Sequence, residues 1–261
     1  MCESCGCALP GHAPAAQTSA TPEGADVASG ALDVLESLLD SNNREAAHNR
    51  EHFDAHGVLA INLMSSPGSG KTSLLEATID AVGQRWRIAV IEGDLETEND
   101  ARRIRARGVP AVQITTGSAC HLDAHMIHHA LHDLALDQID VLFIENVGNL
   151  VCPASFDLGQ HHNVTLLCVT EGDDKPAKYP VMFRKADLVL LTKSDLLDVL
   201  DDFRPEVATA HLRALANPAP VFCLSARRAG SLTAWIDWLD RQISRRRRPL
   251  QRAAPAAAGA V

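Results

Sequence analysis

Residues 64–73 read Met64-Ser65-Ser66-Pro67-Gly68-Ser69-Gly70-Lys71-Thr72-Ser73 and stand between an apolar run and a helical pattern. In that setting the segment matches the nucleotide phosphate-binding loop G-x-x-x-x-G-K-[ST], except that Ser65 replaces the first glycine. Gly68 and Gly70 would let the backbone turn its N–H groups toward phosphate oxygens, and the following helix would add its positive N-terminus. The alternative, a glycine-rich turn with a chance Lys-Thr, fits this setting poorly.

Apolar runs and helical patterns alternate on both sides of this loop. Seven apolar runs are predicted strands: residues 58–64, 88–91, 111–114, 141–144, 164–169, 188–191 and 220–224. Six helical patterns accompany them: residues 31–53, 72–82, 100–106, 122–134, 205–215 and 231–244. Strands that are apolar throughout are typical of a parallel sheet covered on both faces. We therefore predict an α/β fold of the P-loop NTPase kind, with ligands beyond the carboxyl ends of the strands.

Side chains at the strand ends indicate a phosphate and magnesium site. Lys71 would reach the β- and γ-phosphates, and the Thr72 hydroxyl would bind Mg²⁺. Asp94 and Glu145 end two strand candidates and can hold Mg²⁺ directly or through water, unless they are ordinary solvated carboxylates. The predicted phosphate-binding residues are Gly68, Ser69, Gly70, Lys71, Thr72 and Ser73.

The segment Thr192-Lys193-Ser194-Asp195 follows a late strand, where GTPases read guanine with N-K-x-D. The Asp195 carboxylate would accept from guanine N1–H and the exocyclic amine, a donor pair that adenine lacks. Lys193 would lie along the base and ribose, and Ser225-Ala226 would contact the guanine oxygen unless they form an ordinary capping turn. Thr192 stands where Asn is usual, which puts one loop-bracing hydrogen bond and the base selectivity in question.

Three cysteines open the chain. Cys2, Cys5 and Cys7 have C-x-x-C-x-C spacing and can surround one soft or borderline metal ion. A square-planar set would favour Ni²⁺ and a tetrahedral set Zn²⁺. A redox C-x-x-C is the rival interpretation, although no thioredoxin-like pattern follows it.

A second set of soft ligands lies after two strand candidates. Cys120, His121 and Cys152 would converge because strand-end loops of one sheet meet, and they would bind nickel or zinc; buried cysteines without metal are the alternative. Cys168 and Cys223 lie inside strand patterns and are predicted to be core residues.

Histidines also recur at helical spacing. His48, His52 and His56 share one helix face, and the helix after Cys120 carries His125, His128, His129 and His132. Both groups could bind metal, but surface or half-buried histidines without metal are more common.

Composition and charge set the organisation. The chain has 261 residues, is 46% hydrophobic and carries a net charge of −9, which suits one sizeable core and argues against nucleic acid as the main partner. The N-terminus lacks the pattern of a secretory signal, and no apolar run is long enough for a membrane span, so we expect a cytoplasmic protein. We predict a flexible metal-binding tail and linker over residues 1–30, a G domain over 31–245, and a disordered, basic and Ala-rich tail over 246–261.

Several segments together resemble the hydrogenase nickel-incorporation GTPases, the HypB family of maturation factors. The segments are 1–7, 63–72, Glu92-Gly93-Asp94, Thr116 to His125, Glu145 to Pro153 and Glu171 to Pro176. The resemblance implies a dimerising G domain of the SIMIBI class, a tight nickel site at Cys2, Cys5 and Cys7, and a weaker nickel or zinc site at Cys120, His121 and Cys152. It also implies partnership with the nickel chaperone HypA and delivery to the [NiFe]-hydrogenase large subunit precursor. His12 is the one histidine in residues 8–30, so we do not expect the nickel-storage role of relatives that have a His-rich stretch there.

The sequence thus predicts a GTPase in which GTP binding and slow hydrolysis, with Mg²⁺, accompany nickel insertion into [NiFe]-hydrogenase. No glutamine after Glu145-Asn146-Val147-Gly148 is placed to orient the attacking water, which favours slow turnover. Three alternatives remain open: a urease-type nickel GTPase, a metal-buffering protein without enzymatic activity, and a MinD-class ATPase. The cysteine cluster argues against the first, the intact Gly70-Lys71-Thr72 against the second, and Lys193-Ser194-Asp195 against the third.

Overall fold

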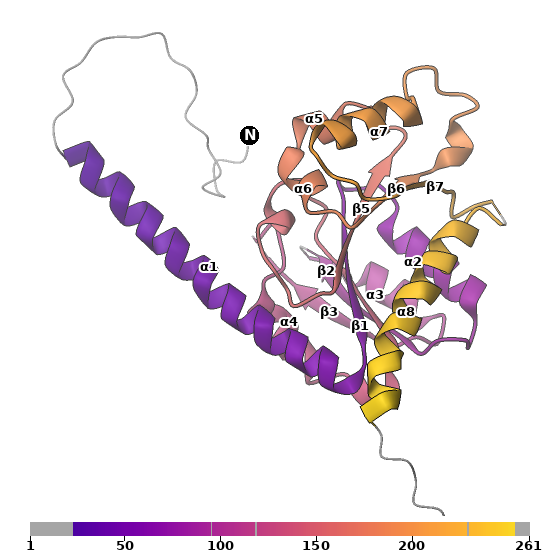
Figure 1. Cartoon of the computed structure of the whole chain (residues 1–261), viewed down its shortest axis with the longest axis horizontal. Coiled ribbons are helices and arrows are strands. Elements are labelled where there is room, and N and C mark those ends of the chain that lie inside the picture. The colour runs from indigo at the N-terminus through magenta and orange to yellow at the C-terminus, as the bar shows by residue number, and fades with distance from the viewer. Residues whose placement is uncertain (1–22, 95, 118, 229, 254–261) are drawn as a thin grey trace, which may run out of the picture.

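The computed structural model describes residues 23–94, 96–117, 119–228 and 230–253 (Figure 1). The predicted cluster of Cys2, Cys5 and Cys7 lies outside the described residues.

A seven-stranded, wholly parallel sheet forms the centre of the molecule, in the order β3-β2-β4-β1-β5-β6-β7. The strands are β1 (Leu59–Met64), β2 (Ile88–Asp94), β3 (Ala111–Thr115), β4 (Val141–Glu145), β5 (His162–Cys168), β6 (Leu188–Thr192) and β7 (Val221–Cys223). Each predicted strand is present, and the predicted α/β fold class is confirmed. All six residues of β1 and all five of β4 are buried, as expected for strands covered on both faces.

The helices are α1 (Glu23–His56), α2 (Lys71–Val82), α3 (Asn99–Arg105), α4 (Ala124–Leu131), α5 (Lys175–Lys178), α6 (Pro180–Arg184), α7 (Pro205–Ala214) and α8 (Thr233–Ala253). Three 3₁₀ turns occupy Leu136–Gln138, Cys152–Ala154 and Ser194–Leu196. The short helices α5 and α6 were not predicted, because four or five residues are too few to show a helical period.

Alternate residues of each strand direct the packing of the helices. Leu59, Ile61 and Leu63 of β1 pack with α2, α3 and α8 on one face of the sheet. Ala60 packs with α1 and α4 on the other face, where α6 and α7 cover the β5–β6 half. Figure 1 shows this arrangement, with α1 and α4 on one side and α2, α3 and α8 on the other.

The two terminal helices are longer than predicted. Helix α1 begins at Glu23 instead of residue 31, within the predicted linker, and in Figure 1 its first part extends well beyond the body of the domain. Helix α8 continues to Ala253, past its predicted end at residue 244 and into the predicted disordered tail. Arg246 accounts for part of this extension, because its guanidinium donates to the Val58 carbonyl (2.8 Å) and pairs with Asp54.

Cys168 is buried, as predicted, but Cys223 is exposed, so its prediction as a core residue is wrong. The reason is topological: β7 is an edge strand, and among the described residues β6 is its one strand partner. Within the described part of the chain, no helix combines the length and apolarity needed to cross a membrane.

Candidate functional site: a nucleotide cavity beside a cysteine–histidine cluster

The predicted phosphate loop joins the end of β1 to the start of α2. Gly68 and Gly70 have φ values of +74° and +94°, a left-handed conformation that L side chains rarely adopt. Gly70 directly precedes α2, so the free N–H groups of the first helical turn open onto the loop. These features form the kind of anion cradle that the sequence predicts.

Ser65, the residue that departs from the loop consensus, contacts Lys71. Its buried hydroxyl donates to the Ser66 carbonyl (2.7 Å) and accepts from the Lys71 ammonium (3.1 Å). A nucleotide phosphate would compete with this hydroxyl for the Lys71 charge. The serine is therefore compatible with the loop, and it gives Lys71 a partner when phosphate is absent.

Two buried carboxyl groups lie next to the loop. Glu145 accepts from the Thr72 hydroxyl (2.9 Å), and Glu92 stands opposite Glu145 in the β2–β4 register. Burial and, after it, the neighbouring Glu145 together raise the pKa of Glu92 to about 11. Burial also raises the pKa of Glu145, against the opposing charge of Lys71. Sequence reasoning assigned no role to Glu92, because its proximity to Glu145 follows from strand register.

The oxygens of this pair fit a magnesium ion. Glu92 Oε1 and Glu145 Oε2 are buried and have no hydrogen-bond partner among the described residues. An all-oxygen set of two carboxylates and the Thr72 hydroxyl is the donor chemistry that Mg²⁺ prefers. Asp94, also predicted to help the metal, borders the same cavity of about 480 Å³, where its carboxylate accepts from the Thr97 hydroxyl (2.6 Å).

A second cavity, of about 280 Å³, lies where the base is predicted to bind. Lys193, Asp195, Ser225 and Ala226 all line it, so the structure brings the predicted guanine-binding residues together. It shares Gly70, Ser73 and Lys193 with the phosphate cavity. A hydrogen bond from Ser225 lowers the pKa of Asp195, which keeps this carboxylate ionised and able only to accept at neutral pH.

The base-binding segment also supports the phosphate loop. The Thr192 hydroxyl donates to the Ser69 carbonyl (2.7 Å), and Lys193 Nζ donates to the Gly68 carbonyl (2.8 Å). Because a peptide unit is planar, holding the Ser69 carbonyl directs the Gly70 N–H to the opposite side. Thr192 thus makes a hydrogen bond that braces the phosphate loop, although it stands where Asn is usual, and its hydroxyl is the donor.

The predicted triad of Cys120, His121 and Cys152 is assembled after β3 and β4. Cys120 Sγ lies 3.0 Å from Cys152 Sγ and 3.8 Å from His121 Nδ1. One ligand atom from each residue lies within 4.8 Å of the others, which is a spacing that fits a single metal ion. Burial lowers the pKa of His121, which favours the neutral imidazole that binds metals.

One loop joins the two sites. It leaves β4 at Glu145, beside the phosphate loop, and reaches Cys152 of the triad. Midway, Gly148 lies so close to the phosphate loop that a Cβ there would stand 2.8 Å from Pro67 Cα. Asn146, which sequence reasoning did not single out, holds the start of this loop by accepting from Leu122 N–H (3.2 Å) and donating to Asn62 (3.2 Å). A movement of the phosphate loop would therefore act on the same loop that carries Cys152.

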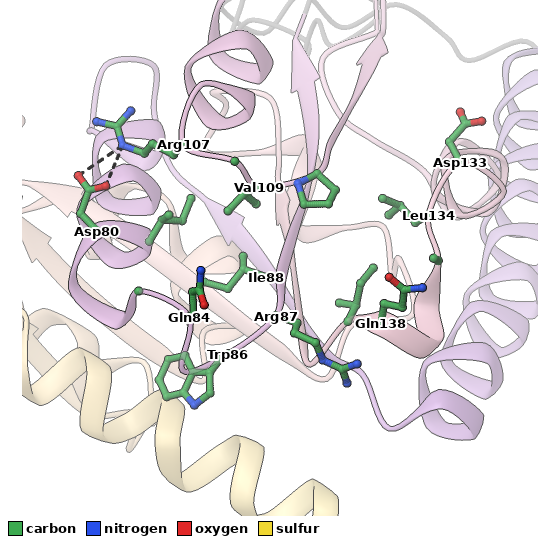
Figure 2. A pocket seen from close by; sticks show the side chains of 16 residues that line it. Asp80, Gln84, Trp86, Arg87, Ile88, Arg107, Val109, Asp133, Leu134 and Gln138 are labelled. Atoms are coloured by element: carbon green, nitrogen blue, oxygen red, sulfur yellow. Dashed lines mark hydrogen bonds and ion pairs between the residues drawn. The ribbon is translucent and has the colours of Figure 1, made fainter.

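A larger cavity, of about 900 Å³, lies at the opposite ends of the strands (Figure 2). Two of its charged side chains are arginines with acidic partners: Arg107 bonds Asp80 (3.2 Å), and Arg87 bonds Asp140 (2.7 Å). Since ligands of such folds bind at the carboxyl ends of the strands, size does not make this cavity the functional site.

Residues 59–222 match the model of the CobW/HypB/UreG family, nucleotide-binding domain. The chain belongs to this family. Within it, the chain is 54% identical to the hydrogenase maturation factor HypB of Azotobacter vinelandii over 217 residues, which are 83% of this chain and 71% of the relative. It is 52% identical to HypB of Escherichia coli K12 over 211 residues, which are 81% of this chain and 72% of the relative.

Solved structures of the family agree with this fold. HypB from Helicobacter pylori in complex with nickel superposes with a TM-score of 0.75 at 44% identity, covering 78% of this chain and 96% of that one. HypB from Archaeoglobus fulgidus superposes with a TM-score of 0.73 at 40% identity, covering 78% of this chain and all of that one. Within the CobW/HypB/UreG family, the chain therefore belongs with the HypB proteins.

Proposed function

We propose that this family member is a GTPase that couples GTP binding and slow hydrolysis to nickel transfer during [NiFe]-hydrogenase maturation. The carrying observation is the single loop that begins at Glu145, bonded to Thr72 of the phosphate loop, and ends at Cys152, in contact with Cys120. A relative crystallised with nickel and relatives that are hydrogenase maturation factors support nickel as the cargo.

In the nucleotide step, Lys71 and the loop amides would stabilise the charge that develops on the phosphates. Thr72 and Glu145, with Glu92 or Asp94 at the same cavity, would hold Mg²⁺. When bound, this ion supplies charge neutralisation at the β- and γ-phosphates. Asp195 would select guanine. No described side chain is assigned to orient water, so GTP acts mainly as a conformational switch.

In the metal step, Cys120, His121 and Cys152 would take nickel, or zinc, and release it according to the nucleotide state of the β4 loop. The resemblance adds four elements to the proposal. These are a homodimer linked to this metal site, nickel supplied by the chaperone HypA, delivery to the large-subunit precursor, and action in the cytoplasm. The tight site would be Cys2, Cys5 and Cys7.

The test is a nickel titration of the full-length chain carrying Cys2→Ser, Cys5→Ser and Cys7→Ser, once with GDP and once with a non-hydrolysable GTP analogue. A typical coupling of about 1–3 kcal/mol corresponds to affinities that differ roughly 5- to 150-fold between the two states. Cys152→Ser should remove the nucleotide-dependent part of the nickel binding, and Cys223→Ser, at an exposed cysteine, should leave that part unchanged. Identical nickel affinities with GDP and with the analogue would show that metal binding at the triad does not respond to the nucleotide.

The enzymatic part has its own measurement. GTP hydrolysis should be measurable in the natural chain and lost in Lys71→Ala. A natural chain without hydrolysis would favour the metal-buffering alternative. In a host lacking its own factor, restoration of urease but not hydrogenase activity would favour the urease-type alternative.

A further inference from the structure

Two histidine groups that are separate in the sequence meet between α1 and α4. His48 and His52 lie one turn apart on α1, with ring centres 4.6 Å apart. His128 of α4 completes a triangle, with its ring centre 5.0 Å from that of His48 and 5.9 Å from that of His52. One ring nitrogen from each residue lies within 4.8 Å of the others. The cysteine–histidine triad lies within the same limit, but here the donors are all imidazole nitrogens.

The hydrogen bonds of Asn49 fix which His128 nitrogen is free. The buried Asn49 amide donates from Nδ2 to the carbonyls of Ala124 (2.8 Å) and Leu158 (3.2 Å), so its Oδ1 must act as an acceptor. His128 Nδ1 lies 3.3 Å from this Oδ1 and 3.5 Å from Glu45 Oε1. Two acceptors at one ring nitrogen require that Nδ1 carries the proton. The lone pair of His128 is therefore on Nε2.

This arrangement is the usual support of a metal-binding imidazole. Ligating histidines typically donate their second ring N–H to a carboxylate or an amide oxygen, which orients the ring and raises its basicity as a ligand. Glu45 also lies 3.9 Å from His48 Nδ1, so one carboxylate is close to two of the three rings. Burial lowers the pKa of His128, and the nearby His48, His132 and His52 lower it further against the pull of Glu45, so the ring stays neutral.

We propose that His48, His52 and His128 form a metal site for a divalent ion that prefers imidazole nitrogen, such as Ni²⁺ or Zn²⁺. Three nitrogen donors and partial exposure leave room for water or an exchanging ligand in the remaining positions. The site goes beyond the proposed function, since it uses none of the cysteines and none of the nucleotide-binding residues. Binding would join α1 to α4, the helix that begins shortly after Cys120 and His121.

A packing role without metal is the competing explanation. Neutral imidazoles can stack, and the α1–α4 contact also contains the Asn49 bonds and the apolar pair Phe53 and Ile127. Such a role predicts that conservative substitution alters helix packing and leaves the metal stoichiometry unchanged. The two explanations therefore differ in the number of metal ions bound per chain.

The experiment measures bound Ni²⁺, and separately Zn²⁺, by equilibrium dialysis of the full-length chain and of His48→Gln and His52→Gln. The His48 side chain is 50% exposed, so its substitution should not disturb folding. The matched control is His211→Gln, at a partly buried histidine of α7, the helix that packs over the β5–β6 half of the sheet. We expect each α1 variant to lose one equivalent, or to bind it at least about tenfold more weakly, as loss of support to a ligand already costs 10- to 100-fold.

Two readouts separate this site from the cysteine sites. The thiolate-to-nickel absorption band and the GTP hydrolysis rate should be the same in His48→Gln as in the natural chain, because neither involves an imidazole of the cluster. The proposal is overturned if both α1 variants keep the full stoichiometry and affinity, or if His211→Gln loses the same equivalent.

Discussion

Thr192→Val tests how the base-binding segment supports the phosphate loop. Valine matches the shape of threonine but removes the hydroxyl that donates to the Ser69 carbonyl at 2.7 Å. Thr192 is 4% exposed, so water does not readily replace the lost donor. Leaving a buried acceptor without this partner costs about 1–3 kcal/mol.

This free-energy cost lowers the stability of the fold, the affinity for nucleotide, or both. In the nucleotide-free protein, each 1 kcal/mol lowers the melting temperature by about 2–4 °C for a domain of this size, so a decrease of about 2–12 °C is the full range. To the extent that the Ser69–Gly70 peptide also loses its orientation, the same free energy weakens GDP binding by at most about 150-fold. Calorimetry without nucleotide and titration with a fluorescent GDP analogue measure the two parts.

Thr192→Ser is the matched control, because it keeps the hydroxyl and removes only a methyl group. It should retain most of the melting temperature and of the GDP affinity. A Thr192→Val protein that melts and binds GDP like the natural chain would refute the reasoning, and so would a serine variant as impaired as the valine one.

Three further changes test other parts of the site. Asp195→Asn should weaken GTP and strengthen xanthosine triphosphate, because an amide pairs with the N1–H and 2-oxo edge; competition against labelled GDP measures both. Gly148→Ala would place a Cβ 2.8 Å from Pro67 Cα, and the displaced phosphate loop should lower GTP hydrolysis by about 10- to 100-fold in a single-turnover assay. For His161, burial lowers the pKa to about 4, with His162 and Arg50 adding to the effect, and Nδ1 accepts from Ala60 N–H. Its contribution to stability, about 3 kcal/mol at most, is fully present above the unfolded pKa of about 6.5 and is lost as pH falls toward 4, which urea unfolding between pH 4 and 7 measures.

Each of these changes has a control or an outcome that would contradict it. Equal affinity of the natural chain for ATP and GTP would contradict the proposal that Asp195 selects guanine. The φ of Gly148 is not in the left-handed range, so backbone strain does not account for an effect of alanine there. Unchanged hydrolysis in Gly148→Ala would show that the added Cβ does not displace Pro67. His161→Gln should flatten the slope of stability between pH 4 and 6.5; an unchanged slope would assign it to other groups.

The fold could be predicted because its strands are buried on both faces and therefore appear as unbroken apolar runs. The phosphate loop and the guanine segment could be predicted because their function constrains neighbouring residues in sequence. Glu92 shows the limit: an acid within an apolar strand has no spacing signature, and its closeness to Glu145 depends on the β2–β4 register. Cys223 shows another, because an apolar run does not reveal that its strand lies at an edge.

The histidine cluster illustrates a third kind of limit. Each helix shows a plausible histidine face, but the approach of His128 to His48 depends on how α1 crosses α4, which sequence periodicity does not encode. The assembly of Cys120 with Cys152 could be anticipated, since strand-end loops of one parallel sheet share an edge.

The direction of α1 determines where its preceding segment joins the domain. The helix ends at His56 and the chain enters β1 at Leu59, so α1 runs back along the sheet, against the direction of the strands (Figure 1). Its 34 residues span about 51 Å, far more than the roughly 20 Å of the six-residue β1. Glu23 therefore lies on the side of the sheet where the strands end, which is also the side of the nucleotide cavity and the cysteine–histidine triad. The first turns of α1 thus extend past the edge of the sheet that carries both sites, while the large cavity lies at the opposite edge (Figure 1).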